Sequence, residues 1–310
     1  MFSLNQCPCC EAQLKETEVK HQLFDVLHKW EENGIVFSQK TGEDYPDNIT
    51  LTLHQCNKCG YGVFLPMTVG SDAFYTDITR NEYYLTDRWD FHVAIKILRS
   101  AKSRSVLDVG CGQGAFLDMV TKQLPGMFCH GNDANPAIRE KLPQGVILHI
   151  NLQDAPSDLD AVTLFQVIEH VADPVGLLSE SIAKVKPGGL VVVSVPDHSG
   201  AIRFFADSHT AIPPHHVSIW TPSSLNSLLN QLGLKVLIQK WEPLPDYLME
   251  AYLPKILSHK LGCLGNPSWE ARVRRFLAIP ILRFCFKLKI KYLPFRGHTY
   301  IVVAQKADTP

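Results

Sequence analysis

The sequence lacks any uninterrupted apolar run that is long enough to cross a bilayer. Its first residues, Met1 to Cys7, also lack the basic stretch and apolar run of a secretory signal peptide. There is no internal repeat and no low-complexity tract. We therefore expect a cytoplasmic protein rather than a secreted or membrane-spanning one.

An excess of charge of one sign is missing as well. The chain has 30 Lys and Arg against 31 Asp and Glu, for a formal net charge of -1. No overall field therefore draws it to nucleic acid. Its 310 residues are 45% hydrophobic and 20% charged, an ordinary globular composition with room for one large domain and appendages.

Cysteine, in contrast, is plentiful. Nine cysteines without a secretion signal indicate a reducing compartment and metal binding rather than disulfides. Four of them form two C-x-x-C pairs, and each two-residue gap lets both thiolates reach one ion. These four are Cys7, Cys10, Cys56 and Cys59.

The pairs predict a zinc ribbon over residues 1–66. The segments 51–56 and 61–65 read as strands that flank the second pair. Four thiolates leave no position for water, so the Zn²⁺ should be structural. Cys9 is then a spare thiol and His54 a strand residue, and the alternative is four free cysteines.

Residues 105–124 predict a strand, a glycine turn and a helix. Glycines at every second position let the backbone turn sharply and approach a ligand, and the helix N-terminus offers unpaired N–H groups to an anion. The dinucleotide pattern G-x-G-x-x-G/A fits Gly110, Gly112 and Ala115, with Asp133 at a suitable distance. Asp108 favours another ligand, because a carboxylate near the end of a buried strand needs a partner, such as an ammonium group.

Strands and helices then alternate along the chain, which predicts a parallel sheet with right-handed crossovers. A helix should begin at Asn135-Pro136, and a turn at 186–189 should lead into a very apolar strand. The predicted strands are 105–109, 128–133, 146–150, 159–167 and 190–195.

With Asp108, the glycine turn resembles motif I of the class I S-adenosylmethionine-dependent methyltransferases. Residues 160–174 and 185–189 are similar to the segment after motif I in small-molecule members, and 213–220 resembles their P-x-H element. Residues 297–306 resemble the last strand of that sheet. The resemblance covers residues 105–243 and 297–306.

This resemblance implies an α/β fold: a Rossmann-like seven-stranded methyltransferase sheet with an N-terminal zinc ribbon and a helical insertion before the last strand. The expected divisions are a zinc ribbon at 1–66, a helical cap or linker at 67–104, and a methyltransferase domain at 105–310. The insertion at 244–296 should form a helical, basic lid.

The same resemblance implies how S-adenosylmethionine is held. Asp108 would act on the ammonium group and Asp133 on the ribose hydroxyls. The other implied contacts are Gly110, Gly112 and Gly114 under the methionine part, Asp154 and Ala155 beside the adenine, and Gln166 near the methionyl group. On the alternative interpretation, Asp133 and Asp154 are ordinary turn residues.

Four histidines are candidates for a catalytic base, because the histidine pKa lies near neutral pH. His215 and His216 belong to the P-x-H element, which should face the acceptor, and His170 and His198 are further candidates. Ubiquinone-pathway O-methyltransferases have been associated with a metal at an E-x-x-E-H motif. Here Gln166 replaces the first acid, which argues against a second metal. Tyr83, Tyr84 or Arg88 are candidates to cover the cofactor, although these residues could simply pack.

The insertion has a charge of its own. Residues 255–296 contain ten Lys or Arg and one acid, hence +9, so the rest of the chain carries about -10. An apolar helical face lies beside Arg283, Lys287 and Lys291, and Pro280 should kink the helix. We expect a lid over the acceptor site, with contact to an anionic membrane surface as the sharper alternative. The apolar face is Leu277, Ile281, Phe284 and Leu288.

The sequence thus predicts methyl transfer from S-adenosylmethionine to a small-molecule acceptor such as a sugar, a lipid-linked compound or a secondary metabolite. One alternative is an RNA methyltransferase that uses the ribbon for RNA contact. We do not expect a nucleic-acid partner, because the ribbon has few basic residues. The other alternative is a non-catalytic zinc-ribbon interaction protein on the same fold.

Overall fold

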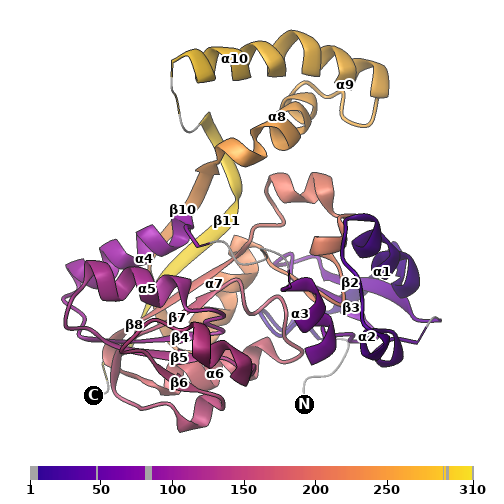
Figure 1. The fold of residues 1–310 in the computed structure, drawn as a ribbon. Coiled ribbons are helices and arrows are strands. Elements are labelled where there is room, and N and C mark those ends of the chain that lie inside the picture. The colour runs from indigo at the N-terminus through magenta and orange to yellow at the C-terminus, as the bar shows by residue number, and fades with distance from the viewer. Residues whose placement is uncertain (1–5, 47, 81–85, 289, 291–292, 309–310) are drawn as a thin grey trace.

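A computed structural model describes residues 6–46, 48–80, 86–288, 290 and 293–308, and it contains two β-sheets (Figure 1). The larger sheet has seven strands in the order β10-β11-β8-β7-β4-β5-β6. β11 runs antiparallel to both of its neighbours, and the other paired strands of this sheet are parallel. The predicted Rossmann-like seven-stranded α/β sheet is confirmed. Its strands are β4 (Ser105–Val109), β5 (Phe128–Asn132), β6 (Ile147–His149), β7 (Leu159–Phe165), β8 (Val185–Pro196), β10 (Leu234–Leu244) and β11 (Leu293–Lys306).

Helices cover both faces of this sheet, because its central strands are apolar on both sides. Alternate residues of β8 pack into different cores on the two faces of the sheet. Val192 packs with α4 and α5, whereas Val191 and Val193 pack with α6 and α7. The four helices are α4 (Trp89–Ser100), α5 (Ala115–Gln123), α6 (Pro174–Ala183) and α7 (Pro222–Gln231).

Two connections differ from the predictions. The helix expected at Asn135-Pro136 is a short 3-10 helix, η1 (Pro136–Lys141), and another such turn, η2 (Leu152–Asp154), follows β6. The turn expected at 186–189 is a bulge inside β8, since Leu159 pairs with Val185 and Ala161 with Leu190. Gly188 in the bulge has φ of 72°, a conformation that glycine adopts without strain.

The smaller sheet has the order β1-β2-β3-β9 and is antiparallel. Its fourth strand comes from far along the chain: Ser218 and Ile219 pair with Val63 and Gly62. The predicted strands around the second cysteine pair are present. The elements are β1 (Leu14–Gln22), β2 (Thr50–Cys56), β3 (Gly62–Leu65) and β9 (Ser218–Ile219), with α1 (Leu23–Glu32), α2 (Gln39–Asp44) and α3 (Asp72–Ile78) alongside.

The ribbon segment is therefore joined to the larger sheet rather than suspended from it. Thr221, the N-cap of α7, donates its hydroxyl to the carbonyl of Cys59 at 2.6 Å. Trp220 and Tyr61 stack edge to face at 5.0 Å in a core that also contains Cys7 and Leu228. One apolar core thus joins the cysteines to α7.

Residues Asp246–Lys287, which we call the arm, lie between β10 and β11. The arm rises from the ends of these two strands and projects away from both sheets (Figure 1). Its base packs on the 3-10 helix η3 (Ala201–Phe205), where Phe205 stacks on Tyr252 at 4.6 Å. The arm consists of α8 (Asp246–Lys260), α9 (Pro267–Val273), the π-helical turn η5 (Arg274–Ala278) and α10 (Ile279–Lys287).

The α-helical hydrogen bonding of the arm breaks at η5, just before Pro280. This residue has no N–H to donate to the carbonyl of Phe276, and a π-helical turn accommodates such a break. The predicted apolar face is mostly turned outward, because Leu277, Phe284 and Leu288 are exposed. The buried side chains here are instead Ala278, Leu282 and Cys285. Among the residues that the structure describes, no helix has the length and apolar character needed to span a membrane.

Candidate functional site

The glycine turn connects β4 to α5 at the carboxyl end of the parallel strands. Gly110, Gly112 and Gly114 have φ of 69°, 49° and 77°, the left-handed region that other residues rarely adopt. A Cβ on Gly110 would lie 2.7 Å from Val167 Cγ2, so glycine is required there for space as well. Gly114 is the N-cap of α5, whose first N–H groups have no partner inside the helix.

Asp133 follows β5 and is tied to this turn. Its carboxylate accepts hydrogen bonds from the backbone N–H of Gly112 at 2.9 Å and of Asn135 at 3.0 Å. The N–H groups of Gly110 and Cys111 both donate to the carbonyl of Asn132. The end of β5 and the glycine turn therefore form one rigid edge.

Asp108 is 4% exposed and sits in β4 beneath this edge. Its carboxyl accepts a hydrogen bond from the hydroxyl of Thr163 at 2.7 Å. Burial raises the pKa of Asp108 to about 7, although the Thr163 bond and the charge of Arg88 oppose the shift. A cation placed beside this carboxyl would be strongly favoured. We call Asp108, Gly110, Gly112, Gly114 and Asp133 the cradle.

The other predicted cofactor contacts lie after the next two strands of the sheet. Asp154, in η2, is exposed and accepts from the Asn151 side chain at 3.1 Å. Ala155 is buried, and its carbonyl accepts from Lys184 Nζ at 2.6 Å. Neither contact involves a residue of the glycine turn or Asp133.

Gln166 ends β7 with φ of 56°, which is unusual for a residue other than glycine. Oriented to satisfy both of its ends, its side-chain amide accepts from Val195 N at 3.2 Å and donates to the Glu169 carboxylate at 3.2 Å. Strained backbone of this kind often lies at functional sites. Gln166 thus connects the strand end to the loop that carries Glu169 and His170.

Three of the four histidines proposed as base candidates, His170, His215 and His216, lie together. The ring centroid of His170 is 4.6 Å from that of His215 and 4.7 Å from that of His216, and the latter two rings stack at 4.5 Å. Burial lowers the pKa of His170 to about 4 and those of the other two well below the usual value. We call His170, His215 and His216 the histidine trio. The hydroxyl of Tyr75 lies 3.2 Å from His170 Nδ1.

Further buried polar groups lie near the trio. Of these, His198 was already a candidate from the sequence, whereas Glu242 and His298 carried no sequence signal. Glu169 is fully buried, and burial raises its pKa to about 8. Several side-chain atoms here have no hydrogen-bond partner among the described residues, which is rare for buried polar groups. They are Glu169 Oε2, His198 Nε2, His216 Nδ1, Glu242 Oε2 and His298 Nδ1. With His170 and His215, these five residues make up what we call the buried polar cluster.

Arg88 and Asp90 form an ion pair close enough to both the cradle and the buried polar cluster to interact with each electrostatically. Arg88 binds Asp90 with two hydrogen bonds, at 3.1 and 2.6 Å, and Ser194 also donates to Asp90 at 2.6 Å. The charges of this pair act on the pKa values of both Asp108 and Glu169. The cradle and the cluster therefore border the same ion pair.

Sequence signals for these additional residues were weak. Glu242 and His298 lie on β10 and β11, whose pairing brings residues from two distant segments together. Asp90 has no sequence signal of its own, and only its contact with Arg88 in the structure links it to the site. The two other proposed cover residues, Tyr83 and Tyr84, lie outside the described residues.

The four predicted zinc ligands also converge. Their Sγ atoms lie within 4.8 Å of one another, with 3.5 Å between Cys7 and Cys59 and 3.5 Å between Cys10 and Cys56. Tetrahedral Zn–S bonds of about 2.3 Å would place sulfur atoms about 3.8 Å apart. A zinc ion therefore fits these four thiols. Cys9 is buried but does not belong to this group of four.

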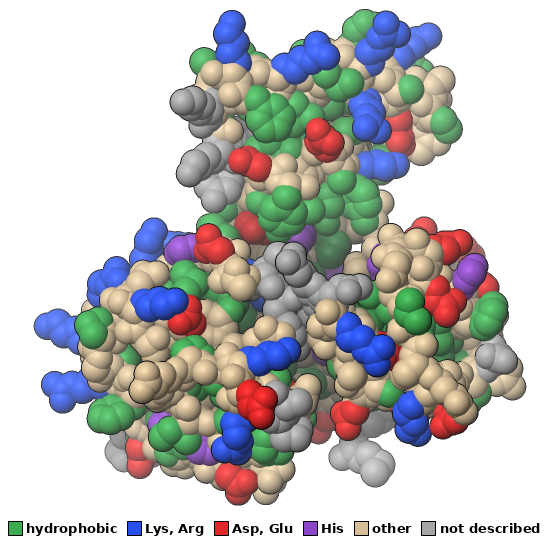
Figure 2. All heavy atoms as spheres, viewed as in Figure 1, with side chains coloured by type: hydrophobic (Ala, Val, Ile, Leu, Met, Phe, Trp, Pro, Cys, Tyr) green, Lys and Arg blue, Asp and Glu red, His purple; other side chains and the backbone are tan. Residues whose placement is uncertain are grey.

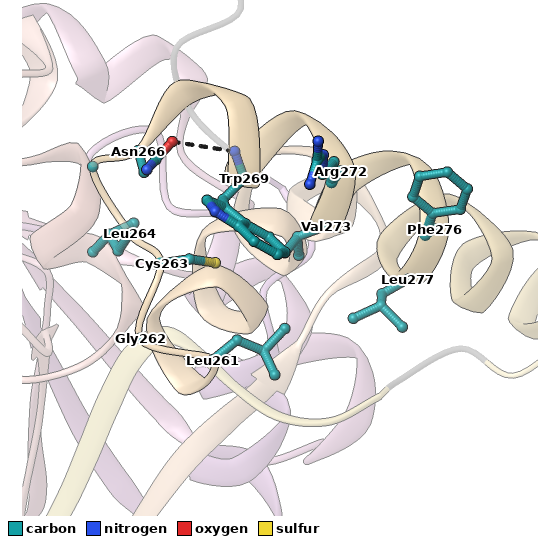
Figure 3. Close-up of a pocket in the computed structure, with 11 residues that line it drawn as sticks. Leu261, Gly262, Cys263, Leu264, Asn266, Trp269, Arg272, Val273, Phe276 and Leu277 are labelled. Carbon is teal, nitrogen blue, oxygen red and sulfur yellow. Dashed lines mark hydrogen bonds between the residues drawn. The ribbon is translucent and has the colours of Figure 1, made fainter.

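A pocket of about 840 Å³ lies in the arm rather than at the cradle (Figure 3). Leu261, Leu264, Trp269 and Phe276 line it, and Arg272 lies over the Trp269 ring at 5.0 Å. Its lining is mainly apolar and faces outward. It offers none of the titratable groups found at the buried polar cluster.

Known proteins resemble this chain in sequence and in fold. A family model described as a methyltransferase domain matches residues 81–239. An S-adenosylmethionine-dependent methyltransferase of Mycolicibacterium smegmatis is 31% identical over 148 residues, 46% of this chain and 56% of that protein. A ubiquinone biosynthesis O-methyltransferase of Paracidovorax citrulli is 32% identical over 111 residues, 31% of this chain and 45% of that protein.

The chain thus spans about half the length of these curated relatives. A solved chain from the complex of the Haloferax volcanii Trm112 methyltransferase activator with a methyltransferase superposes with a TM-score of 0.52. That likeness covers 78% of this chain and 99% of the other, at 18% identity, and it concerns the fold alone.

We expect Asp108 to make folding stability depend on pH. Its pKa is about 7 in the folded chain against an ordinary 3.8, so the folded state binds more protons between these values. Stability from this group is therefore present below about pH 4 and is lost as pH rises to about 7. Asp108→Asn should flatten the change in unfolding free energy between about pH 5 and pH 8, measured by chemical denaturation.

Asp118→Asn is the matched control, because Asp118 is exposed and pairs with Lys122. It should keep the pH dependence of the unmodified chain. An equal pH dependence of stability in Asp108→Asn and Asp118→Asn would contradict the assignment of a raised pKa to Asp108.

Proposed function

The chain belongs to the methyltransferase domain family, whose model matches more than half of it, and we propose that it transfers a methyl group from S-adenosylmethionine to a small-molecule acceptor. The observation that carries this proposal is the adjacency of the cradle to the buried polar cluster. The cradle supplies a place for a cofactor with a cationic end, and the cluster supplies groups for a polar acceptor.

The cradle fits S-adenosylmethionine on three counts. The buried Asp108 carboxyl suits the ammonium group, the two oxygens of Asp133 suit the two ribose hydroxyls, and the positive φ angles of the glycines let the backbone turn beneath the methionine part. We assign Gln166, Asp154 and Ala155 to the methionyl and adenine ends, as the resemblance implies. When bound, the cofactor supplies an activated methyl group on its sulfonium.

Methyl transfer needs the acceptor to be held in line and, for a hydroxyl or amine, to lose a proton. We propose that the histidine trio receives that proton. His170 Nδ1–H donates to the carbonyl of His215 at 2.8 Å, which leaves Nε2 as the basic nitrogen. Glu169 Oε1 lies 3.9 Å from this nitrogen. Because burial raises the pKa of Glu169 to about 8, this group would stabilise a charged ring only after losing its own proton.

The acceptor should have a polar head. The atoms without partners in the buried polar cluster include both donors and acceptors, which a polyhydroxylated compound could satisfy. Burial makes each unsatisfied atom costly, so an acceptor that pairs with several of them gains specificity. This supports a sugar or a lipid-linked sugar more than an apolar metabolite.

The two other functions are less well supported. Residues 1–66 contain five Lys against nine Asp and Glu, a poor surface for RNA phosphates. A non-catalytic interaction protein would have no use for a buried Asp108 beside an open glycine turn. We therefore retain the small-molecule enzyme as the proposed function.

We also propose that Cys7, Cys10, Cys56 and Cys59 hold one structural zinc ion. The close thiols and the shared core of the ribbon and α7 support this assignment. Zinc would fix the knuckle against which Thr221 and Trp220 pack.

For the arm, we propose contact with an anionic membrane surface. Eighteen large hydrophobic side chains are exposed among the described residues, and ten of them lie between Tyr247 and Ile290. Trp269 is 51% exposed and Phe276 is 66% exposed, although aromatic side chains of this size are usually buried.

Basic side chains lie beside these apolar ones. Figure 2 shows Lys and Arg gathered along the outer edge of the arm, with hydrophobic side chains between them. Arg283 and Lys287 are exposed, one helical turn apart, and Lys291 lies outside the described residues. Apolar side chains flanked by cations are typical of helices that lie in a membrane interface. Such contact would suit a lipid-linked acceptor.

The cofactor assignment is tested by calorimetry. S-adenosylmethionine should bind, and Asp133→Ala should weaken binding by about 1.5–3 kcal/mol, the scale of hydrogen bonds to a charged group. Asp118→Ala, an exposed aspartate change on α5, should leave the affinity unaltered. Binding of NAD in place of S-adenosylmethionine would refute the assignment.

Elemental analysis of protein purified without added metal tests the zinc ion. The Cys56→Ser/Cys59→Ser variant should lose one equivalent of zinc, because two thiolates cannot hold a structural site. The Cys129→Ser/Cys263→Ser variant removes two thiols elsewhere and should keep it. Unchanged zinc content in the first variant would exclude this site.

Sedimentation with vesicles tests the membrane contact. The chain should bind anionic vesicles at low salt and less at high salt, since each interfacial Lys or Arg adds about 1 kcal/mol. Arg283→Glu/Lys287→Glu should reduce binding. The control Lys20→Glu/Lys122→Glu changes β1 and α5, which lie outside the arm, and should not reduce it. Equal binding by both variants, or none by the unmodified chain, would leave the arm without a membrane role.

A further inference from the structure

The histidine trio has a geometry that a proton-accepting role does not require. One ring nitrogen from each of His170, His215 and His216 lies within 4.8 Å of the others. The trio comes from two loops, one after β7 and one before β9, that are 45 residues apart in sequence. Three imidazoles brought this close can offer their nitrogens to one ion.

Two of the rings are oriented through their Nδ1 atoms. His170 Nδ1–H donates to the carbonyl of His215 at 2.8 Å, and His215 Nδ1–H donates to the carbonyl of Thr210 at 2.7 Å. Each bond fixes the tautomer in which Nε2 carries the lone pair. Backbone carbonyls orient metal-binding histidines in the same way.

The third ring and a neighbouring acid also favour a cation. His216 is 9% exposed, and its Nδ1 has no hydrogen-bond partner among the described residues. The fully buried Glu169 likewise has Oε2 unpaired, with its other oxygen 3.9 Å from His170 Nε2. Burial favours the protonated form of this group, and a cation bound nearby would favour its ionised form.

From this geometry we propose that His170, His215 and His216 bind a divalent transition-metal ion of the zinc class. Three neutral imidazoles suit zinc, and three protein ligands are the number found where a fourth position stays open. This site is separate from the four cysteines. It contradicts our expectation from Gln166 that no second metal binds.

Metal binding requires only a small rearrangement of the three histidine rings. Tetrahedral Zn–N bonds of about 2.0–2.1 Å place nitrogen atoms about 3.4 Å apart, so the present separations must close by rotation of the rings. His215 and His216 now stack with 17° between their planes, and they would have to open toward the ion.

The role of the ion rests on the proposed function. Because Gln166 joins the end of β7 to the Glu169 loop, an ion at the trio would lie where the acceptor is expected. Its open position would hold a polar group of the acceptor. With the ion bound, the ring nitrogens of the trio serve as ligands and no longer as the proton acceptor proposed above. The existence of the site does not depend on that role, and the two are tested separately.

Cobalt(II) is the probe for the full chain, purified metal-free. We expect two equivalents to bind: one with the near-ultraviolet charge-transfer band of cobalt thiolates, and one with visible bands only, typical of nitrogen ligands. The Cys56→Ser/Cys59→Ser variant should lose the first band and keep the second equivalent. His170→Gln/His216→Gln should lose the second and keep the first.

His130→Gln is the matched control, since His130 and His149 form another close pair, with 3.0 Å between ring nitrogens, but lack a third histidine. It should bind both equivalents. A single equivalent in the unmodified chain, or a second equivalent that survives His170→Gln/His216→Gln, would overturn the proposal.

X-ray absorption of the unmodified chain loaded with zinc avoids any folding defect of the variants. The account expects sulfur neighbours at about 2.3 Å and nitrogen neighbours at about 2.0 Å, whereas a sulfur-only shell would contradict it. Calorimetry with S-adenosylmethionine distinguishes the metal site from the proposed function. If cobalt binds the trio but the cofactor does not bind, only the proposed function is refuted. If the cofactor binds but cobalt does not bind the trio, only the metal site is refuted.

Discussion

The structure depends on the burial of ionisable groups at the carboxyl edge of its parallel sheet. Asp108, Glu169, His215 and His216 are buried and His170 is largely so, although charged groups are costly to bury without partners. Their pKa values all move toward the neutral form because of that burial. A fold would not keep this arrangement for stability, so it indicates that binding partners complete it.

The ribbon contributes to this edge through β9. The segment that carries His215 and His216 continues directly into Ser218 and Ile219, which pair with β3 next to the cysteine knuckle. Thr221 then fastens α7 to the carbonyl of Cys59. A structural zinc ion would therefore hold the histidine loop in place. The ribbon would then have a structural role that does not require contact with RNA.

Local patterns in the sequence predicted the five parallel strands and the glycine turn, whereas the complete seven-stranded sheet was predicted from the family resemblance. The apolar run at Ser105–Val109, the glycines and Asp133 are close in sequence, so one βαβ unit fixes their arrangement. The pairing of β9 with β3 could not be predicted, because a two-residue strand has no pattern of its own. Glu242 and His298 were missed for a similar reason: each reaches the buried polar cluster only through pairing across distant strands.

The arm shows where helical periodicity misleads. Leu277, Phe284 and Leu288, expected to form the apolar face, are exposed, whereas Ala278, Leu282 and Cys285 are buried. Sequence alone does not say which of two apolar faces packs against α8, and the π-helical turn before Pro280 changes the helical phase along the arm. The outward face is what makes a membrane role worth testing.

The central claim is that the cradle binds S-adenosylmethionine through the buried carboxyl of Asp108. The most direct measurement is calorimetry of S-adenosylmethionine binding near pH 6.5, in two buffers with different ionisation enthalpies. Since the pKa of Asp108 is about 7, the account predicts that binding releases a proton and that affinity rises with pH until it levels off above about 7. Asp108→Asn should remove both effects, and binding without proton release, or with release unchanged in Asp108→Asn, would contradict the account.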